Sequence, residues 1–165
     1  MTDQSLAVTT VVNARPETVF DLLADPSTHP AIDGTGWVRP PIDPAPLTEV
    51  GQIFRMGMYH ENHPNKHYEM ANRVEVLDRP HAIAWQPGAE PKDIPGYQGP
   101  PDAGIDYGGW IWRYDLVPAG SGTAVTLTYD WSNVSPHHRD IEFPPFPESH
   151  LENSLRNLAA LAEQA

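Results

Sequence analysis

The alternation of apolar and polar positions predicts a chain that starts with a strand and two short helical turns. Residues 6–12 predict a strand rich in β-branched residues. Residues 16–23 predict a short helix, because Pro16 suits a first helical turn and Glu17 places negative charge at its positive end. Residues 25–27, Asp-Pro-Ser, start a second turn, which a flexible bend at 33–36 ends.

Strands with a two-residue period are predicted through the middle of the chain. We expect them at residues 52–60, 67–77, 83–85, 110–116 and 125–131. The strand at Ile83 and Trp85 is expected to be short because Pro80 and Pro87 flank it. Prolines between residues 37 and 50 remove ladder donors, so only an edge strand or a loop is expected there. Residues 119–122, Ala-Gly-Ser-Gly, predict a hairpin turn.

The chain ends in one long predicted helix. Its apolar face carries leucines at helical spacing: Leu151, Leu155, Leu158 and Leu161. A polar stripe runs beside them, formed by His150, Ser154 and Asn157. This stripe either borders a cavity or faces solvent. An antiparallel sheet with one apolar face needs a cover, so the helix is expected to lie against the sheet.

The order of elements predicts an α+β protein with a single domain over residues 1–165. About six mostly antiparallel strands lie between the short helices and the terminal helix. The least regular stretch, residues 88–109, is rich in proline and glycine and is typical of a lid, a binding loop or a disordered segment. Residues 136–147 form a second proline-rich connection.

Composition narrows the classes of function. Ten Lys and Arg against 22 Asp and Glu give a net charge of −12, which argues against nucleic-acid binding. The absence of cysteine excludes disulfides, thiolate nucleophiles and sulfur-ligated zinc. No stretch approaches the roughly 20 apolar residues that span a bilayer, so we expect a cytoplasmic protein without membrane insertion.

The sequence lacks key residues of most catalytic and metal-binding motifs. The Gly34-Thr35-Gly36 run lacks the third glycine of a dinucleotide fingerprint, and no G-x-S-x-G occurs. A hairpin could bring His60 and His67 together, with His63 between them, as imidazole ligands for zinc, nickel or copper. We favour the alternative, a polar hairpin tip whose histidines face water. No metal and no cofactor are therefore expected.

Aromatic and sulfur-containing side chains share faces of the predicted strands. Trp110, Trp112 and Tyr114 lie on one face of their strand. Another strand groups Met56, Met58 and His60, and a third groups Met70, Asn72, Val74 and Val76. Rings and flexible thioethers are good lining for a planar apolar ligand. A buried Asn72 would need partners from protein, water or ligand. The alternative is that these side chains pack on the terminal helix and leave no void.

The chain resembles the START-like, or SRPBCC, superfamily. The segments that carry the resemblance are residues 16–23, PETVFDLL; the bend from Asp25-Pro26-Ser27 to His29-Pro30; Gly34 to Trp37; residues 128–132, TYDWS; and residues 150–155, HLENSL. Within the superfamily the chain is most similar to bacterial proteins described as polyketide cyclase/dehydrase-like. The resemblance runs from about Leu6 to Glu163, and its motifs are specific for the fold and not for a reaction.

This resemblance implies a helix-grip fold: a curved antiparallel sheet of about six to seven strands wraps around the long C-terminal helix and leaves a cavity between them. Members bind lipids, polyketides, hormones or quinones, and some catalyse reactions. Fold alone does not decide among these roles. The stretch at 88–109 is longer than a plain hairpin needs and is a departure from the family pattern.

Two functions follow as hypotheses. The first is binding of a hydrophobic, aromatic or polyketide-like molecule, for which the expected ligand contacts are Met56, Met58, His60, Asn72, Trp85, Trp110, Trp112, Tyr114 and His150. The second is an aromatase/cyclase or dehydratase, with His60 as the candidate catalytic base or acid. A third, weaker hypothesis is an interaction module that presents proline-rich loops. A homodimer is compatible with the sequence.

Overall fold

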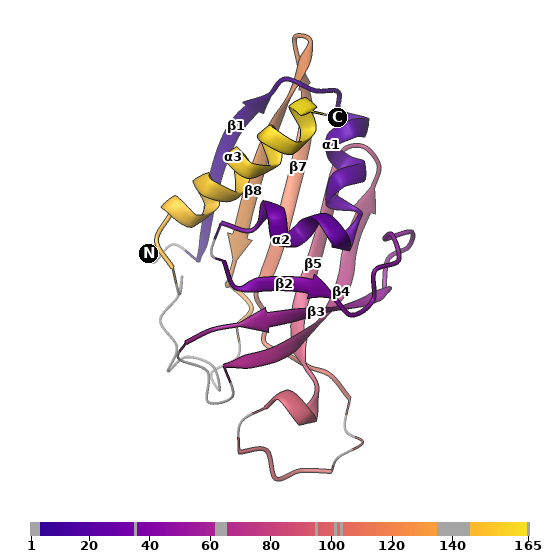
Figure 1. The fold of residues 1–165 in the computed structure, drawn as a ribbon, viewed down its shortest axis with the longest axis vertical. Coiled ribbons are helices and arrows are strands. Elements are labelled where there is room, and N and C mark those ends of the chain that lie inside the picture. Colours follow the sequence, from indigo (N-terminus) through magenta and orange to yellow (C-terminus); the bar gives the residue numbers. More distant parts are fainter. Residues whose placement is uncertain are drawn as a thin grey trace.

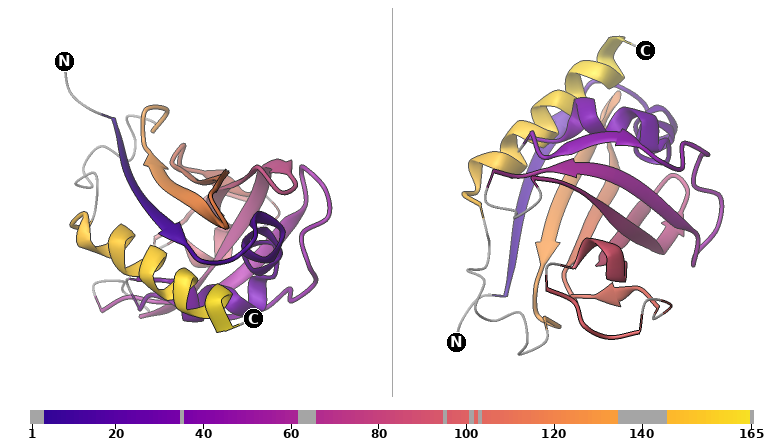
Figure 2. Two further views of the ribbon diagram at one scale, coloured as in Figure 1. Left: turned by 90° about the horizontal axis from the view of Figure 1, so that it is seen from above. Right: turned by 60° about the horizontal axis from the view of Figure 1, so that its bottom comes forward.

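The computed structural model describes residues 4–34, 36–61, 66–94, 96–100, 102, 104–134 and 146–164. A curved antiparallel sheet encloses one side of the C-terminal helix α3 (Ser149–Gln164) (Figure 1). Viewed from above, α3 crosses the open side of the curve (Figure 2). The predicted α+β class with a helix-grip-like arrangement is confirmed.

Eight strands are present in the described part of the chain. They are β1 (Ser5–Val12), β2 (Val38–Pro41), β3 (Ile53–Tyr59), β4 (His67–Asp78), β5 (Ala82–Ala89), β6 (Asp106–Tyr107), β7 (Ile111–Ala119) and β8 (Gly122–Asp130). Their order in the sheet is β1-β8-β7-β5-β4-β3-β2, and β6 pairs with β5. The sheet exceeds the six to seven predicted strands because β2 and β6 are short pairings in proline- and glycine-rich segments.

The segment between β1 and β2 folds as its sequence predicts. Helix α1 (Pro16–Leu23) begins at a proline and has Glu17 in its first turn. The 3-10 helix η1 (Pro26–Thr28) is capped by Asp25, whose Oδ1 accepts the Ser27 amide at 3.0 Å. Helix α2 (His29–Ile32) follows directly. These turns carry the chain across the concave side of the sheet (Figure 1).

The hairpins also follow the predicted pattern. In the β7–β8 hairpin, Ala119 pairs with Gly122 across a two-residue turn, and Gly120 adopts a φ of 62° that favours glycine. Strand β2 contains Pro40 and Pro41 and lies at an edge of the sheet, where missing N–H donors are tolerated.

Strand β5 differs from prediction because it continues through Pro87 to Ala89. On one side it pairs with β4 as far as Gly88. On the other side the β7 pairing ends at Trp85, and the β6 pairing starts at Gly88. Pro87 thus occupies a gap between two partner strands, which is where a residue without an N–H fits into a sheet.

A β-bulge in β4 makes the predicted grouping of Val76 with Val74 wrong. The register shifts between Val74, which pairs with Trp85, and Val76, which pairs with Ala84. The extra residue reverses the alternation, so Leu77 packs against the core in the place that a strict two-residue period gives to Val76. The grouping of Val74 with Asn72 and Met70 is not affected, because these residues precede the bulge.

The terminal helix is anchored by both of its predicted stripes. Leu151, Leu155 and Leu158 are buried in the core. In the polar stripe, Ser154 Oγ accepts the Gly34 amide at 2.8 Å, and Asn157 Nδ2 donates to the Ile32 carbonyl at 3.2 Å. These two residues therefore hold the α2–β2 connection, and Ser154 also lines the cavity, so part of the stripe borders the cavity.

Gly34 allows this close approach between the α2–β2 connection and α3. A Cβ atom at this position would overlap the backbone carbonyl of His150 and would lie 2.8 Å from the Ser154 nitrogen. Only a residue without a side chain permits that contact. The connection and the helix consequently close one side of the space beneath the sheet.

Candidate functional site

A cavity of about 380 Å³ lies between the concave face of the sheet, the α2–β2 connection and α3. This volume falls within the range typical of small-molecule sites. Its aromatic wall consists of Trp37, Phe54, Tyr68, Trp85, Trp110, Trp112, Tyr114, Tyr129 and Phe146. Three thioethers, of Met56, Met58 and Met70, add flexible apolar surface. The rings therefore do not fill the space beneath the helix.

Eight of the nine residues expected to contact a ligand line this cavity. They are Met56, Met58, His60, Asn72, Trp85, Trp110, Trp112 and Tyr114. His150 is not part of the lining. Its ring stacks on Phe146 with centroids 5.8 Å apart and meets the edge of Trp37 at 6.1 Å. It thus lies next to two lining residues.

Strand alternation explains why these side chains converge. In β3, Phe54, Met56 and Met58 occupy every second position and face the cavity. In β7, Trp112 and Tyr114 do the same, and Trp112 stacks on Phe146 with centroids 5.5 Å apart. The contact with Phe146 joins the sheet to the segment that leads into α3.

His29 is a lining residue that the sequence analysis did not select. Its side chain is buried, and Nε2 lies 2.8 Å from the Leu23 carbonyl oxygen. The ring stacks on Trp85 with centroids 5.0 Å apart. Burial lowers the pKa of His29 below its ordinary value of 6.5, although the Leu23 carbonyl opposes this shift. A neutral imidazole that donates from Nε2 keeps Nδ1 as an acceptor.

Asp33 is the acidic residue among the described lining residues. It follows α2 directly, and its Oδ2 accepts the amides of Trp37 at 3.0 Å and Val38 at 3.1 Å. Two backbone donors fix the carboxylate at the wall of the cavity. No lysine or arginine lines the cavity in the described part of the chain.

Two tyrosine hydroxyls remain protonated near this carboxylate. Burial, with a smaller contribution from the charge of Asp33, raises the pKa of Tyr114 well above its ordinary value. The same two causes raise the pKa of Tyr68. Both hydroxyls can therefore donate and accept hydrogen bonds at neutral pH.

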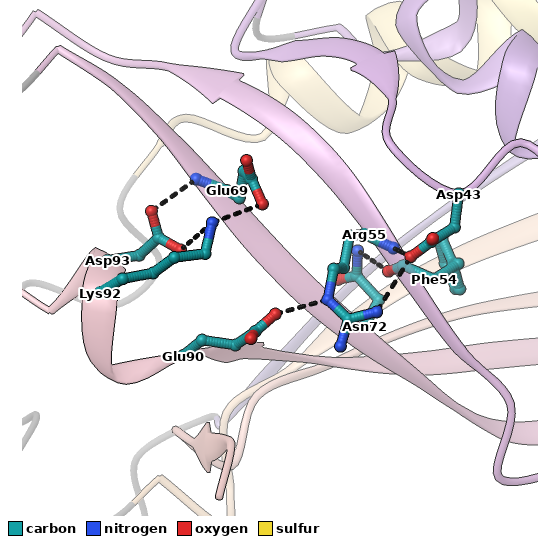
Figure 3. Close-up of polar contacts among 8 residues, drawn as sticks. All are labelled: Asp43, Phe54, Arg55, Glu69, Asn72, Glu90, Lys92 and Asp93. Atoms are coloured by element: carbon teal, nitrogen blue, oxygen red, sulfur yellow. Dashed lines mark hydrogen bonds and ion pairs between the residues drawn. The ribbon is translucent and has the colours of Figure 1, made fainter. Parts of the chain in front are cut away.

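Asn72 has one partner within the sheet. Its Nδ2 donates to the Phe54 carbonyl at 3.3 Å (Figure 3). The side chain is buried and lines the cavity. This bond satisfies one donor of the amide, which explains how a polar residue is tolerated among apolar neighbours.

The histidine hairpin does not bring the candidate metal ligands His60 and His67 together. Tyr59 pairs with His67 in the β3–β4 ladder, and their rings touch with centroids 5.0 Å apart. His60 is next in sequence and faces the cavity, where its ring lies 4.6 Å from that of Trp37. His60 and His67 thus project from opposite faces of the sheet, and His63 lies outside the described residues.

The outer face of the sheet differs from the cavity because it carries ion pairs. Arg55 forms ion pairs with Asp43 and Glu90 (Figure 3). Lys92 lies 2.8 Å from Glu69 (Figure 3). Arginines from β4 and β7 pair with carboxylates in the same way: Arg73 with Glu75 and Arg113 with Asp115. Each of these outer-face carboxylates is paired with a cation, whereas the described lining of the cavity contains Asp33 and no lysine or arginine.

The lining residues that the sequence analysis missed come mainly from irregular segments. His29, Asp33 and Trp37 lie on or beside short helical turns, and Phe146 precedes α3. A two-residue or helical period cannot indicate a cavity from such segments. Tyr68 shares parity with Asn72 on β4, so alternation could have found it. Tyr129 pairs with Trp112 across the β7–β8 hairpin, so the hairpin register was the signal for this residue.

Within the described residues, no helix has both the length and the apolar character needed to cross a membrane. The 88–109 stretch contains the 3-10 helix η2 (Pro91–Asp93) and β6, so part of it is ordered structure. Residues 95, 101 and 103 of that stretch lie outside the described residues, as does most of the second proline-rich connection, residues 135–145.

Comparison with solved structures finds the same fold along nearly the whole chain. Protein CV1439 from Chromobacterium violaceum is 18% identical with a TM-score of 0.64, and 97% of each chain is covered. Protein NE0264 from Nitrosomonas europaea is 14% identical with a TM-score of 0.67, covering 98% of this chain and 95% of its own. The solution structure of the KanY protein is 17% identical, with a TM-score of 0.63 and 99% coverage of each chain.

No protein-family model and no curated protein matches the chain. At identities below a fifth, the structural likenesses establish shared architecture and not shared chemistry. What these proteins have in common with this chain is an antiparallel sheet that is covered by a C-terminal helix.

Proposed function

We propose that this protein binds a hydrophobic, ring-containing small molecule between its sheet and α3, as a member of the SRPBCC superfamily of the polyketide cyclase/dehydrase-like type. The observation that carries the proposal is the 380 Å³ cavity, whose wall is built mainly from aromatic rings and thioethers. Transfer of an apolar ligand from water into a largely apolar pocket of this kind is favourable.

A preformed wall favours binding because little ordering is required. The rings contact one another: Trp85 lies 5.8 Å from Phe54 and 6.0 Å from Tyr114, between centroids. His29 is held by both Trp85 and the Leu23 carbonyl. Side chains that are already fixed lose little conformational freedom when a ligand arrives.

A neutral, polarity-sensitive naphthalene dye such as prodan tests this proposal directly. We expect saturable binding with a blue-shifted emission, accompanied by a change in intrinsic fluorescence, because four of the five tryptophans line the cavity. Extraction and mass spectrometry of the purified protein would then identify a natural ligand. A protein that takes up neither dye nor extractable ligand would contradict the proposal.

A substitution that fills the cavity provides the specific control. Met58→Trp adds a ring at a lining position and is expected to weaken dye binding at least about tenfold, since the added volume competes with the ligand. Val117→Trp adds the same ring at a position that is 59% exposed and is expected to leave binding unchanged. Equal effects of both substitutions would mean that the dye binds elsewhere.

The second candidate function is catalysis on a poly-ketone substrate by an aromatase/cyclase or dehydratase. It is favoured by two imidazoles in the same apolar cavity, those of His60 and His29. An imidazole can take a proton from a carbon between carbonyls and return it to a leaving hydroxyl. The test is turnover of a synthetic poly-β-ketone. Unchanged product formation by His60→Ala would refute the assignment of His60 as the base.

A further inference from the structure

We propose that the ligand of this cavity carries a protonated amine on its apolar body, and that Asp33 is the counter-ion. This inference rests on the proposed function, because it names the chemical class of the molecule that the cavity would hold. It is carried by the combination of one fixed carboxylate, several aromatic faces and a described lining without lysine or arginine.

The position of Asp33 suits a cation. Its Oδ2 is held by the amides of Trp37 and Val38, at 3.0 and 3.1 Å, so the carboxylate is oriented before any ligand arrives. A carboxylate and an ammonium form a charge-assisted hydrogen bond, which is stronger than a bond between neutral groups. The surrounding apolar wall screens such a bond much less than water does.

The influence of this charge extends over the cavity. The negative charge of Asp33 contributes to the raised pKa values of Tyr114, on β7, and Tyr68, on β4. It also opposes the effect of burial on the pKa of His29, after the larger contributions of the Leu23 carbonyl and Asp25. A cationic group in the cavity therefore meets a favourable potential, and an anionic group meets an unfavourable one.

The rest of the wall favours the same class of ligand. Four tryptophans, Trp37, Trp85, Trp110 and Trp112, line the space, and tryptophan has the aromatic face that attracts cations most strongly. His29 contributes an imidazole whose Nε2 donates to a backbone carbonyl, which keeps its other nitrogen as an acceptor. Acceptors and ring faces recognise an ammonium. The described lining contains no lysine or arginine that would pair with a ligand carboxylate or phosphate.

Three ligands of one shape test the proposal: 2-(2-naphthyl)ethylamine, 2-(2-naphthyl)ethanol and 2-naphthylacetate, measured by calorimetry at pH 7. An alkyl amine is protonated at this pH. We expect the amine to bind wild-type protein at least about tenfold more tightly than the alcohol, with the acetate weakest. This comparison needs no variant, so it does not depend on how a substitution affects folding.

Asp33→Asn identifies the counter-ion. The amide oxygen of the substituted side chain can still accept from the Trp37 and Val38 amides, so the substitution removes charge while it preserves these bonds. We expect the preference for the amine to fall to within about twofold, with little change for the alcohol. Asp78→Asn changes net charge equally at an exposed position outside the cavity and should retain the full preference.

The outcomes separate the two proposals. If the alcohol binds wild-type protein and the amine binds no more tightly, the amine class is wrong while the proposed binding function stands. If Asp33→Asn keeps the wild-type preference, Asp33 is not the counter-ion. If none of the three ligands binds and the neutral dye also fails, both proposals are wrong.

Discussion

The two ends of the sheet's concave face are filled in different ways. At one end Leu116 pairs with Val125, and both belong to the same buried apolar cluster as Leu158 of α3. At the other end Trp112 pairs with Tyr129, and both rings line the cavity together with Phe146. We refer to these as the solid end, residues Leu116, Val125, Leu127, Leu155 and Leu158, and the hollow end, residues Met58, Trp112, Tyr129 and Phe146.

The shape of the side chains explains why a cavity persists at one end and not at the other. Branched aliphatic side chains interdigitate until the interior is close-packed. Rings that contact one another form a rigid wall, as Trp112 and Tyr129 do with centroids 4.6 Å apart and ring planes tilted by 50°. One strand pair thus supplies stability at one end and ligand space at the other.

Truncation of a core side chain at the solid end is expected to have the largest effect on the free energy of unfolding. Leu158→Ala removes a fully buried side chain, and we expect the free energy of unfolding to fall by about 2–5 kcal/mol. Met58→Ala at the hollow end removes a partly exposed side chain beside existing space and should cost less. Denaturant unfolding measures both, with exposed Val117→Ala as the control. If Leu158→Ala and Met58→Ala lowered the free energy of unfolding equally, the proposed difference in packing between the two ends would be wrong.

A smaller effect on the free energy of unfolding is expected from a substitution where the α2–β2 connection meets α3. Gly34→Ala places a Cβ against the backbone of α3 at His150 and Ser154. We expect a loss of about 1–3 kcal/mol, because the contact must open to admit the new atom. Gly104→Ala, at a position with open space around it, serves as the matched control in the same unfolding experiment. A neutral Gly34→Ala would mean that the connection is not held against the helix.

The smallest expected effect is a pH dependence that originates at His29. Burial lowers the pKa of this histidine in the folded protein, whereas the unfolded chain has the ordinary value of about 6.5. The unfolded state therefore binds the proton more readily, and the free energy of unfolding should fall as pH drops below about 6.5. The slope from this group is at most about 1.4 kcal/mol per pH unit.

His29→Gln isolates this contribution. Glutamine can donate to the Leu23 carbonyl but does not titrate, so the variant should lose less stability between pH 6.5 and pH 5 than the wild type does. All other titrating groups are common to the two proteins. Parallel pH profiles would show that burial of the His29 imidazole in the cavity wall does not penalise its protonation.

The regular elements were predictable from sequence, and the irregular wall of the cavity was not. The two-residue period placed Met56, Trp112 and Tyr114 on the concave face, because alternation is set by the backbone. The period failed at the β4 bulge, where one extra residue brought Leu77 inward. Asp33 lies in a connection whose position depends on contacts with α3, and these have no local pattern in the sequence.

The edge strand β2 limits how copies of this chain can associate. Pro40 and Pro41 leave gaps in the row of donors that a neighbouring strand would need. Growth of the sheet by strand addition at this edge is therefore disfavoured, which protects the protein from edge-to-edge aggregation. A homodimer that extends the sheet would have to use the other edge strand, β1.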